Sequence, residues 1–119
     1  MKPDDLNRML VRRFPALVDG YLEAKRLWGG EEPGPHIVYG DVLVPFIRAT
    51  LAQEASADQL GAVMEFLEEL STAADSDVLD VVVTSVLEPL LAQKERSRLE
   101  NAMGPRTQKL WRRLVEDMS

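Results

Sequence analysis

Acidic side chains at helical spacing are the groups in this sequence that are best placed to do chemistry. Glu65 and Glu69 are four residues apart, and Asp77 and Asp80, which follow a short turn, are three apart. Residues three or four apart are neighbours on one face of a helix. We therefore expect two antiparallel helices whose carboxylates gather on one side of the molecule, where they can meet a basic partner or hold a hard cation.

The same region resembles a known metal-binding pattern. Glu65-x-x-Glu68 followed by Asp77-x-x-Asp80 is similar to the paired acidic motifs with which the all-α nucleotide pyrophosphohydrolases hold Mg²⁺. The resemblance implies a Mg²⁺-dependent hydrolase, and this is the alternative function. The sequence departs from the pattern, because Gly and Ala stand in place of the usual leading Glu-Glu pair and the gap between the two motifs is short.

His36, the only histidine, lies in a stretch rich in glycine and proline, residues 29–40, beside Glu31 and Glu32. Irregular segments of this length are uncommon in compact domains and often carry function. A lone histidine does not make a catalytic triad without a nucleophile, and no G-x-S-x-G motif occurs. We therefore expect a non-enzymatic protein with no catalytic residue, cofactor or metal site. The candidate partner-binding residues are Glu65, Glu69, Asp77, Asp80, Glu31, Glu32 and His36.

Charge is distributed unevenly along the chain, whose net charge is −6. Residues 31–92 contain twelve acidic residues and one basic residue, whereas both flanking parts carry a small positive excess. An acidic middle argues against binding to a phosphate backbone. We therefore expect a basic protein partner and no nucleic acid, or pairing of the acidic middle with the basic ends.

Two amphipathic helices must position the acidic residues. The first is predicted over residues 60–70, with Leu60, Val63, Met64, Leu67 and Leu70 on one face. Ser56 and Gln59 before it have the spacing of a capping box. The second is predicted over residues 78–93, with Leu79, Val82, Val83, Val86, Leu87 and Leu90 on one face. Its β-branched residues 81–84 favour a strand locally, but they do not alternate as a half-buried strand would. Pro89 is expected to kink or end its regular part.

Glu68 lies at the border of the apolar face of the first of these helices. A partly buried carboxylate requires a positive or hydrogen-bonding partner. Arg48 and the arginines of the last predicted helix are the candidates.

The remaining helices are predicted over residues 4–13, 15–28, 42–54, 94–103 and 106–118, with Asp41 as a cap and Trp111 as a core residue. The fold class is therefore all-α, with about six short helices in antiparallel pairs, as a compact bundle or a short helical-repeat-like stack. We expect a single domain over residues 1–119. The absence of cysteine, of a long apolar run and of a signal sequence favours a cytoplasmic protein with no membrane contact.

Several short motifs carry a second resemblance: Phe14-Pro15-Ala16-Leu17, Glu32-Pro33 with His36, Gly40-Asp41-Val42-Leu43 with Pro45-Phe46, Phe66-Leu67-Glu68, and Ser85-Val86-Leu87-Glu88. Together they are similar to a group of small, uncharacterised all-α bacterial proteins, some of them encoded near toxin systems and suspected of being immunity proteins. The resemblance implies a bacterial cytoplasmic protein that binds another protein, and it supplies no catalytic residues. The leading hypothesis is thus an immunity-like or antitoxin-like inhibitor, and a structural homodimer is a further alternative.

Overall fold

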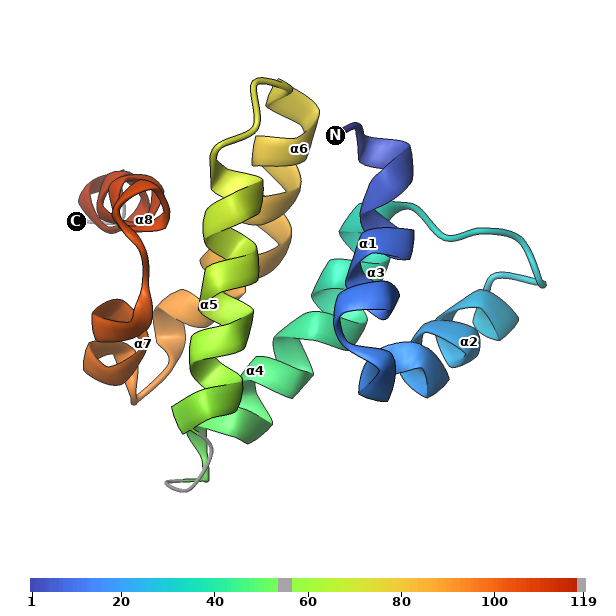
Figure 1. The fold of residues 1–119 in the computed structure, drawn as a ribbon, viewed down its shortest axis with the longest axis horizontal. Coiled ribbons are helices and arrows are strands. Elements are labelled where there is room, and N and C mark those ends of the chain that lie inside the picture. The colour runs from blue at the N-terminus through green and yellow to red at the C-terminus, as the bar shows by residue number, and fades with distance from the viewer. Residues whose placement is uncertain (54–56, 118–119) are drawn as a thin grey trace.

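A computed structural model describes residues 1–53 and 57–117, and these residues form helices and turns but no strand (Figure 1). The α-helices are α1 (Leu6–Arg13), α2 (Val18–Leu27), α3 (Pro35–Val38), α4 (Val44–Leu51), α5 (Ala57–Ser71), α6 (Ser76–Asp80), α7 (Arg96–Ala102) and α8 (Pro105–Asp117). Two π-helical segments are η3 (Tyr39–Leu43) and η5 (Val81–Leu87), and the 3₁₀ turns are η1 (Pro3–Asp5), η2 (Pro15–Leu17) and η6 (Glu88–Ala92). The all-α prediction is confirmed, and the helices form a compact bundle.

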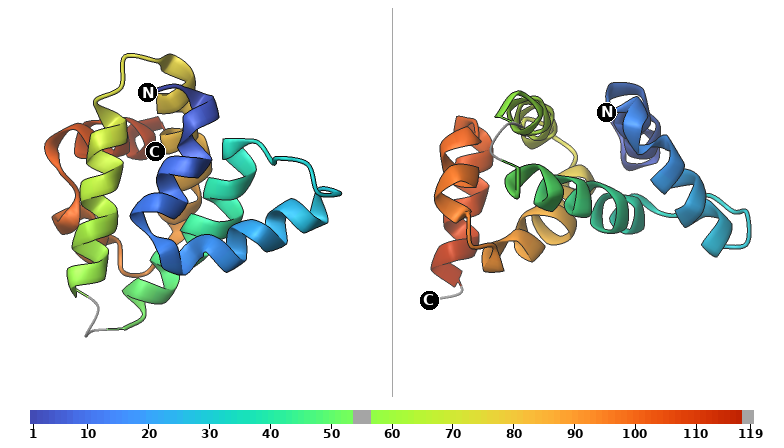
Figure 2. Two further views of the ribbon diagram at one scale, coloured as in Figure 1. Left: turned by 45° about the vertical axis from the view of Figure 1, so that its right-hand side comes forward. Right: turned by 90° about the horizontal axis from the view of Figure 1, so that it is seen from below.

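Helix α5 runs through the middle of the bundle, with α1 to α4 on one side and α7 and α8 on the other (Figure 1). Helix α2 and the connection that follows it project at one end of the molecule (Figure 2). Within the described ranges, no helix combines the length and the apolar character needed to cross a membrane.

The predicted apolar face of α5 is confirmed. Its five residues, Leu60, Val63, Met64, Leu67 and Leu70, are all buried in the core. Phe66 joins them and makes an edge contact with Phe14 and a stacked contact with Tyr39, with ring centroids 5.5 and 6.4 Å apart. Trp111 of α8 is also buried, as predicted, and donates a hydrogen bond of 2.6 Å from Nε1 to Glu100. The predicted cap at Ser56 and the residue Met118 lie outside the described residues.

The second predicted helix is observed, but the assignment of its buried face was wrong in part. Val78 and Val81 are in the core, whereas Leu79 and Val83 are only half-buried. The buried residues from Val78 to Val86 recur at i, i+3, i+4, i+7 and i+8, so the core covers a face of this helix adjacent to the predicted one.

The segment 29–40 is not irregular throughout, contrary to expectation. Helix begins at Pro35, so Asp41 lies inside the π-helical segment η3 and does not cap a helix at residue 42. Pro45 explains the π turn, because proline lacks an N–H and its ring clashes with the carbonyl four residues earlier. A wider turn relieves that clash, and η5 precedes Pro89 in the same way.

The two π-helical segments pack against each other. Gly40 of η3 lies so close to η5 that a Cβ atom at this position would be 3.7 Å from the carbonyl oxygen of Ser85. This crossing brings α3, at the start of one helical segment, next to α6 and η5 in the other.

Candidate functional site

Glu65 and Glu69 lie on the exposed side of α5, but Glu69 is already paired within the molecule. Arg13 of α1 donates two hydrogen bonds to its carboxylate, 2.8 and 3.1 Å long, and lies over the Phe66 ring. These hydrogen bonds hold the pKa of Glu69 below its usual value. The basic N-terminal part therefore neutralises one of the predicted partner-binding acids, which is the internal pairing that the charge distribution allowed.

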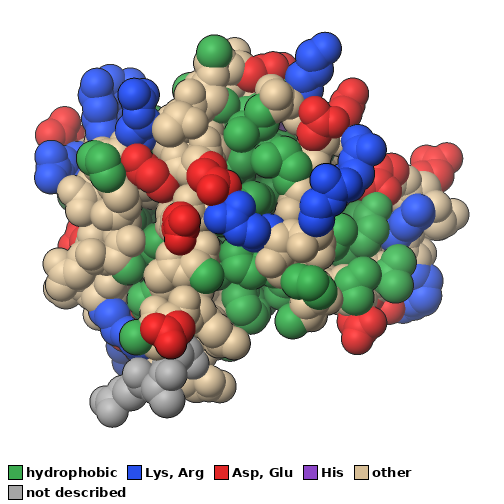
Figure 3. Space-filling model, in the orientation of Figure 1, with side chains coloured by type: hydrophobic (Ala, Val, Ile, Leu, Met, Phe, Trp, Pro, Cys, Tyr) green, Lys and Arg blue, Asp and Glu red, His purple; other side chains and the backbone are tan. Residues whose placement is uncertain are grey.

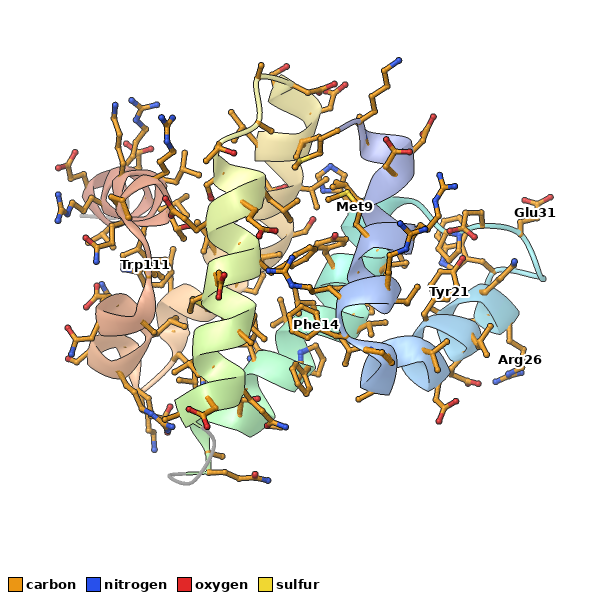
Figure 4. The ribbon with its side chains drawn as sticks, viewed as in Figure 1. Met9, Phe14, Tyr21, Arg26, Glu31 and Trp111 are labelled. Carbon is orange, nitrogen blue, oxygen red and sulfur yellow. The ribbon has the colours of Figure 1, made fainter. Side chains whose placement is uncertain are left out.

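Glu32 also makes contacts within the chain. It accepts hydrogen bonds from the Tyr21 hydroxyl and from Asn7, and Lys25 lies 4.0 Å away. The hydrogen bond from Tyr21 holds the pKa of Glu32 low, while burial and the same contact raise the pKa of Tyr21 to about 12. Glu31 points outward from the connection after α2 (Figure 4). Both side chains are exposed, but Glu32 anchors this connection through its contacts within the chain.

Asp77 and Asp80 are both exposed on α6. A side chain of the acidic turn caps this helix, as predicted. Asp75 accepts hydrogen bonds from the backbone N–H groups of Asp77 and Val78, 2.8 and 3.4 Å long. Asp80 lies near a residue that is distant in the sequence, with its Oδ2 atom 3.6 Å from Nε2 of His36. The structure therefore brings together two of the predicted partner-binding residues, Asp80 and His36.

His36 also meets two hydroxyl groups of η5. Its Nδ1 atom is 2.6 Å from Oγ of Ser85 and 3.4 Å from Oγ1 of Thr84. The order Asp80–His36–Ser85 resembles that of a catalytic triad, but a nucleophile must be open to substrate. Ser85 is 9% exposed within η5, beneath His36. The geometry supports a structural role, in which the His36 side chain links α3 to η5 by hydrogen bonds.

Sequence reasoning did not find Ser85 and Thr84 as partners of His36. They are 49 and 48 residues away along the chain, and the contact depends on the crossing of η3 and η5. The two prolines that follow the π-helical segments indicate a distortion within each helix, but they do not indicate that the two segments cross.

The four acids that suggested a Mg²⁺ site are not assembled into one. In the part of the chain that the structure describes, no three Asp, Glu or His side chains are grouped so that they could hold a metal ion. Glu68, the second acid of the first motif, is instead used at the N-terminus of α8. It accepts hydrogen bonds from the backbone N–H groups of Arg106 and Thr107, 3.0 and 2.9 Å long, and from the Thr107 hydroxyl.

The partner of Glu68 lies in the last helix, as one of the two expectations stated, but the hydrogen bonds come from Thr107 and from the backbone N–H of Arg106. Arg48 is not that partner, since it donates to Pro89 and Gln93. Partial burial raises the pKa of Glu68, but the hydrogen bonds from Thr107 and Arg106 outweigh it, so the pKa lies below its usual value.

A groove of about 320 Å³ lies between α6–η5 and α8. Its apolar lining consists of four half-buried aliphatic side chains: Leu79, Val83, Leu110 and Leu114. Its polar lining consists of Ser76, Asp80, Arg113 and Asp117. Asp80 therefore belongs both to the groove and to the contact with His36. The volume is at the lower end of the range for ligand pockets, and it suits one or two apolar side chains of a partner.

Residues 7–119 match the model of a domain of unknown function, DUF7674. No curated protein and no solved structure was found to match the chain.

Proposed function

The chain belongs to the DUF7674 family, and we propose that it is a non-enzymatic module that binds another protein in the groove between α6–η5 and α8. One observation carries the proposal. Four aliphatic side chains from two helices line a groove that is open to solvent and has charged residues among its lining. Grooves between helices accept an amphipathic segment of a partner, whose apolar side chains fill the space.

The energy of such binding comes mainly from apolar burial. Complete burial of one Leu or Val side chain contributes about 1.5–3 kcal/mol. The half-buried side chains of the groove would add to the binding free energy, because the partner covers the part of their surface that is still exposed. Affinity should therefore depend most on the four aliphatic side chains that line the groove.

The charges of the groove favour a basic partner. Asp80 and Asp117 contribute two negative charges and Arg113 contributes one positive charge. Opposite charges on a partner raise the association rate and the specificity more than the affinity itself. We therefore propose a partner segment that carries Lys or Arg beside its apolar residues, which agrees with the acidic character of residues 31–92.

An immunity-like or antitoxin-like inhibitor is the specific form of binding module that we propose. A groove whose charged lining is mostly acidic suits a target that presents a basic surface. The alternative Mg²⁺-dependent hydrolase receives less support, because Glu68 caps α8 instead of facing Asp77 and Asp80.

Selection from a random peptide library displayed on phage tests the proposal and requires no named partner. Peptides are selected on the wild-type protein and counter-selected on Leu79→Gln, a variant of similar size whose folding is checked by thermal unfolding. We expect enriched peptides that place Leu, Ile or Phe within one helical turn of Lys or Arg. Failure to enrich any peptide, or enrichment of acidic peptides, would refute the proposed groove.

A further inference from the structure

Helix α2 covers the core with one side only and leaves apolar residues exposed on the other. Its inner side is formed by Ala24, which is buried, and by Gly20, whose position would place a Cβ atom 3.1 Å from Val42. On the outer side, Val18 and Leu22 are 40% and 53% exposed. They are four residues apart and therefore form one continuous strip. Hydrophobic side chains gather over this part of the surface (Figure 3).

The charged residues of α2 are ordered along the helix. Asp19 is in the first turn, and Lys25 and Arg26 are in the last. Asp19 and Arg26 are seven residues apart, so they lie on the same flank of the strip formed by Val18 and Leu22. This flank of the helix therefore carries Asp19 near its beginning and Arg26 near its end, with Glu23, the present partner of Arg26, between them.

This order makes the surface complementary to itself. If two α2 helices pack in antiparallel orientation, a two-fold axis places Asp19 of each copy opposite Arg26 of the other, so the ion pair forms twice. The two Leu22 side chains, which lie near the middle of the helix, then meet each other close to the axis. In a parallel pair the same flank of each copy would lie on opposite sides of the contact, so these ion pairs would not form.

We propose that this surface of α2 binds a second copy of the chain. The contact is independent of the groove, because α2 and α8 lie at opposite ends of the molecule (Figure 1). Helix α2 has ten residues, which is about 15 Å of helix, so the contact is small and the dimer forms reversibly with concentration.

Arg26 can exchange its present contact for the new one. In the single copy it bonds Glu23 of its own helix, at 2.6 and 3.0 Å, and both side chains are more than half exposed. Exposed pairs of this kind contribute little to stability. Arg26 can therefore turn toward the second copy, and it points outward from α2 as that contact requires (Figure 4).

Sedimentation velocity over a concentration series tests the proposal with single charge reversals. We expect the wild type to shift from monomer to dimer, and Leu22→Asp to remain monomeric. Asp19→Arg and Arg26→Asp should each raise the dimer Kd about tenfold, because each creates two like-charge contacts. Lys109→Glu, a charge reversal on the exposed side of α8, is the matched control and should dimerise as the wild type does.

The decisive sample is an equimolar mixture of Asp19→Arg and Arg26→Asp. In the antiparallel pair every reversed residue then meets an opposite charge, so the mixture should dimerise as strongly as the wild type although each variant alone does not. A wild type that is monomeric at all concentrations would overturn the proposal and leave this surface for a different protein. A dimer insensitive to Leu22→Asp, or a mixture that stays monomeric, would also overturn it.

Discussion

Glu68 of α5 caps the N-terminus of α8 through Thr107. The Oε1 atom accepts hydrogen bonds of 2.9 Å from both the backbone N–H and the hydroxyl of Thr107. A side chain of one helix thus satisfies the free N–H groups with which another helix begins. Because α8 forms one wall of the groove, this contact fixes the geometry of the proposed binding site.

Replacing Glu68 by Gln should reduce stability and its dependence on pH. Loss of a capping group costs about 1 kcal/mol. The pKa of Glu68 is lower in the folded protein than its ordinary value of 4.5. Its stabilising effect is therefore complete above about pH 4.5 and disappears as the pH falls through the lowered folded value. Urea unfolding of both proteins over a range of pH should show a difference that shrinks in acid, whereas a constant difference would contradict this role.

Gly104→Ala should act through the same carboxylate. A Cβ atom at residue 104 would lie 2.5 Å from Cδ and Oε1 of Glu68, so the carboxylate must move away from α8. We expect a loss of about 1–2 kcal/mol in the wild type and almost none in Glu68→Ala, where the obstructing side chain is absent. Chemical denaturation of the four proteins measures this coupling.

The matched control is Gly61→Ala, on the exposed side of α5 with no atom near its added Cβ. It should stabilise the protein by up to about 1 kcal/mol, because alanine favours helix more than glycine does. Equal losses from Gly104→Ala with and without Glu68 would show that the backbone, and not the carboxylate, is disturbed.

His36→Ala should destabilise the crossing of α3 and η5. Removal of the imidazole leaves the buried Oγ of Ser85 without its partner, which costs about 1–3 kcal/mol. When His36→Ala is introduced into the Ser85→Ala variant, the loss of stability should be smaller, because no buried hydroxyl is then left unpaired. Thermal unfolding of the two single variants and the double variant measures the coupling. Additive losses would indicate that the 2.6 Å contact contributes nothing.

Much of the fold could be predicted from sequence, because regular α-helical spacing is a local property. The apolar residues of α5 and the burial of Trp111 followed directly from that spacing. The π-helical segments could not be placed in this way, since the sequence shows Pro45 and Pro89 but not the winding that accommodates them. Leu79 and Val83 line the groove because the core covers the adjacent face of their helix, and which face is covered depends on the packing of the whole bundle.

The candidate site was predictable only in part. Asp80 and His36 were named from charge and from an unusual stretch of sequence, yet their contact depends on how η3 and η5 cross. Glu69 and Glu32 were named on the same grounds, but Arg13 and Tyr21 bind them inside the molecule. Charge composition identifies acidic residues and cannot tell which of them a neighbouring helix will neutralise.

The most direct test of the proposed function is calorimetric titration of a selected peptide into the wild type, Asp80→Lys and Glu65→Lys. Asp80 lines the groove, and Glu65 is an exposed acid on α5 outside it. We predict that Asp80→Lys weakens binding by about tenfold or more, and that Glu65→Lys changes it by less than about twofold. Unchanged binding to Asp80→Lys, or a loss confined to Glu65→Lys, would contradict the assignment of the groove as the partner-binding site.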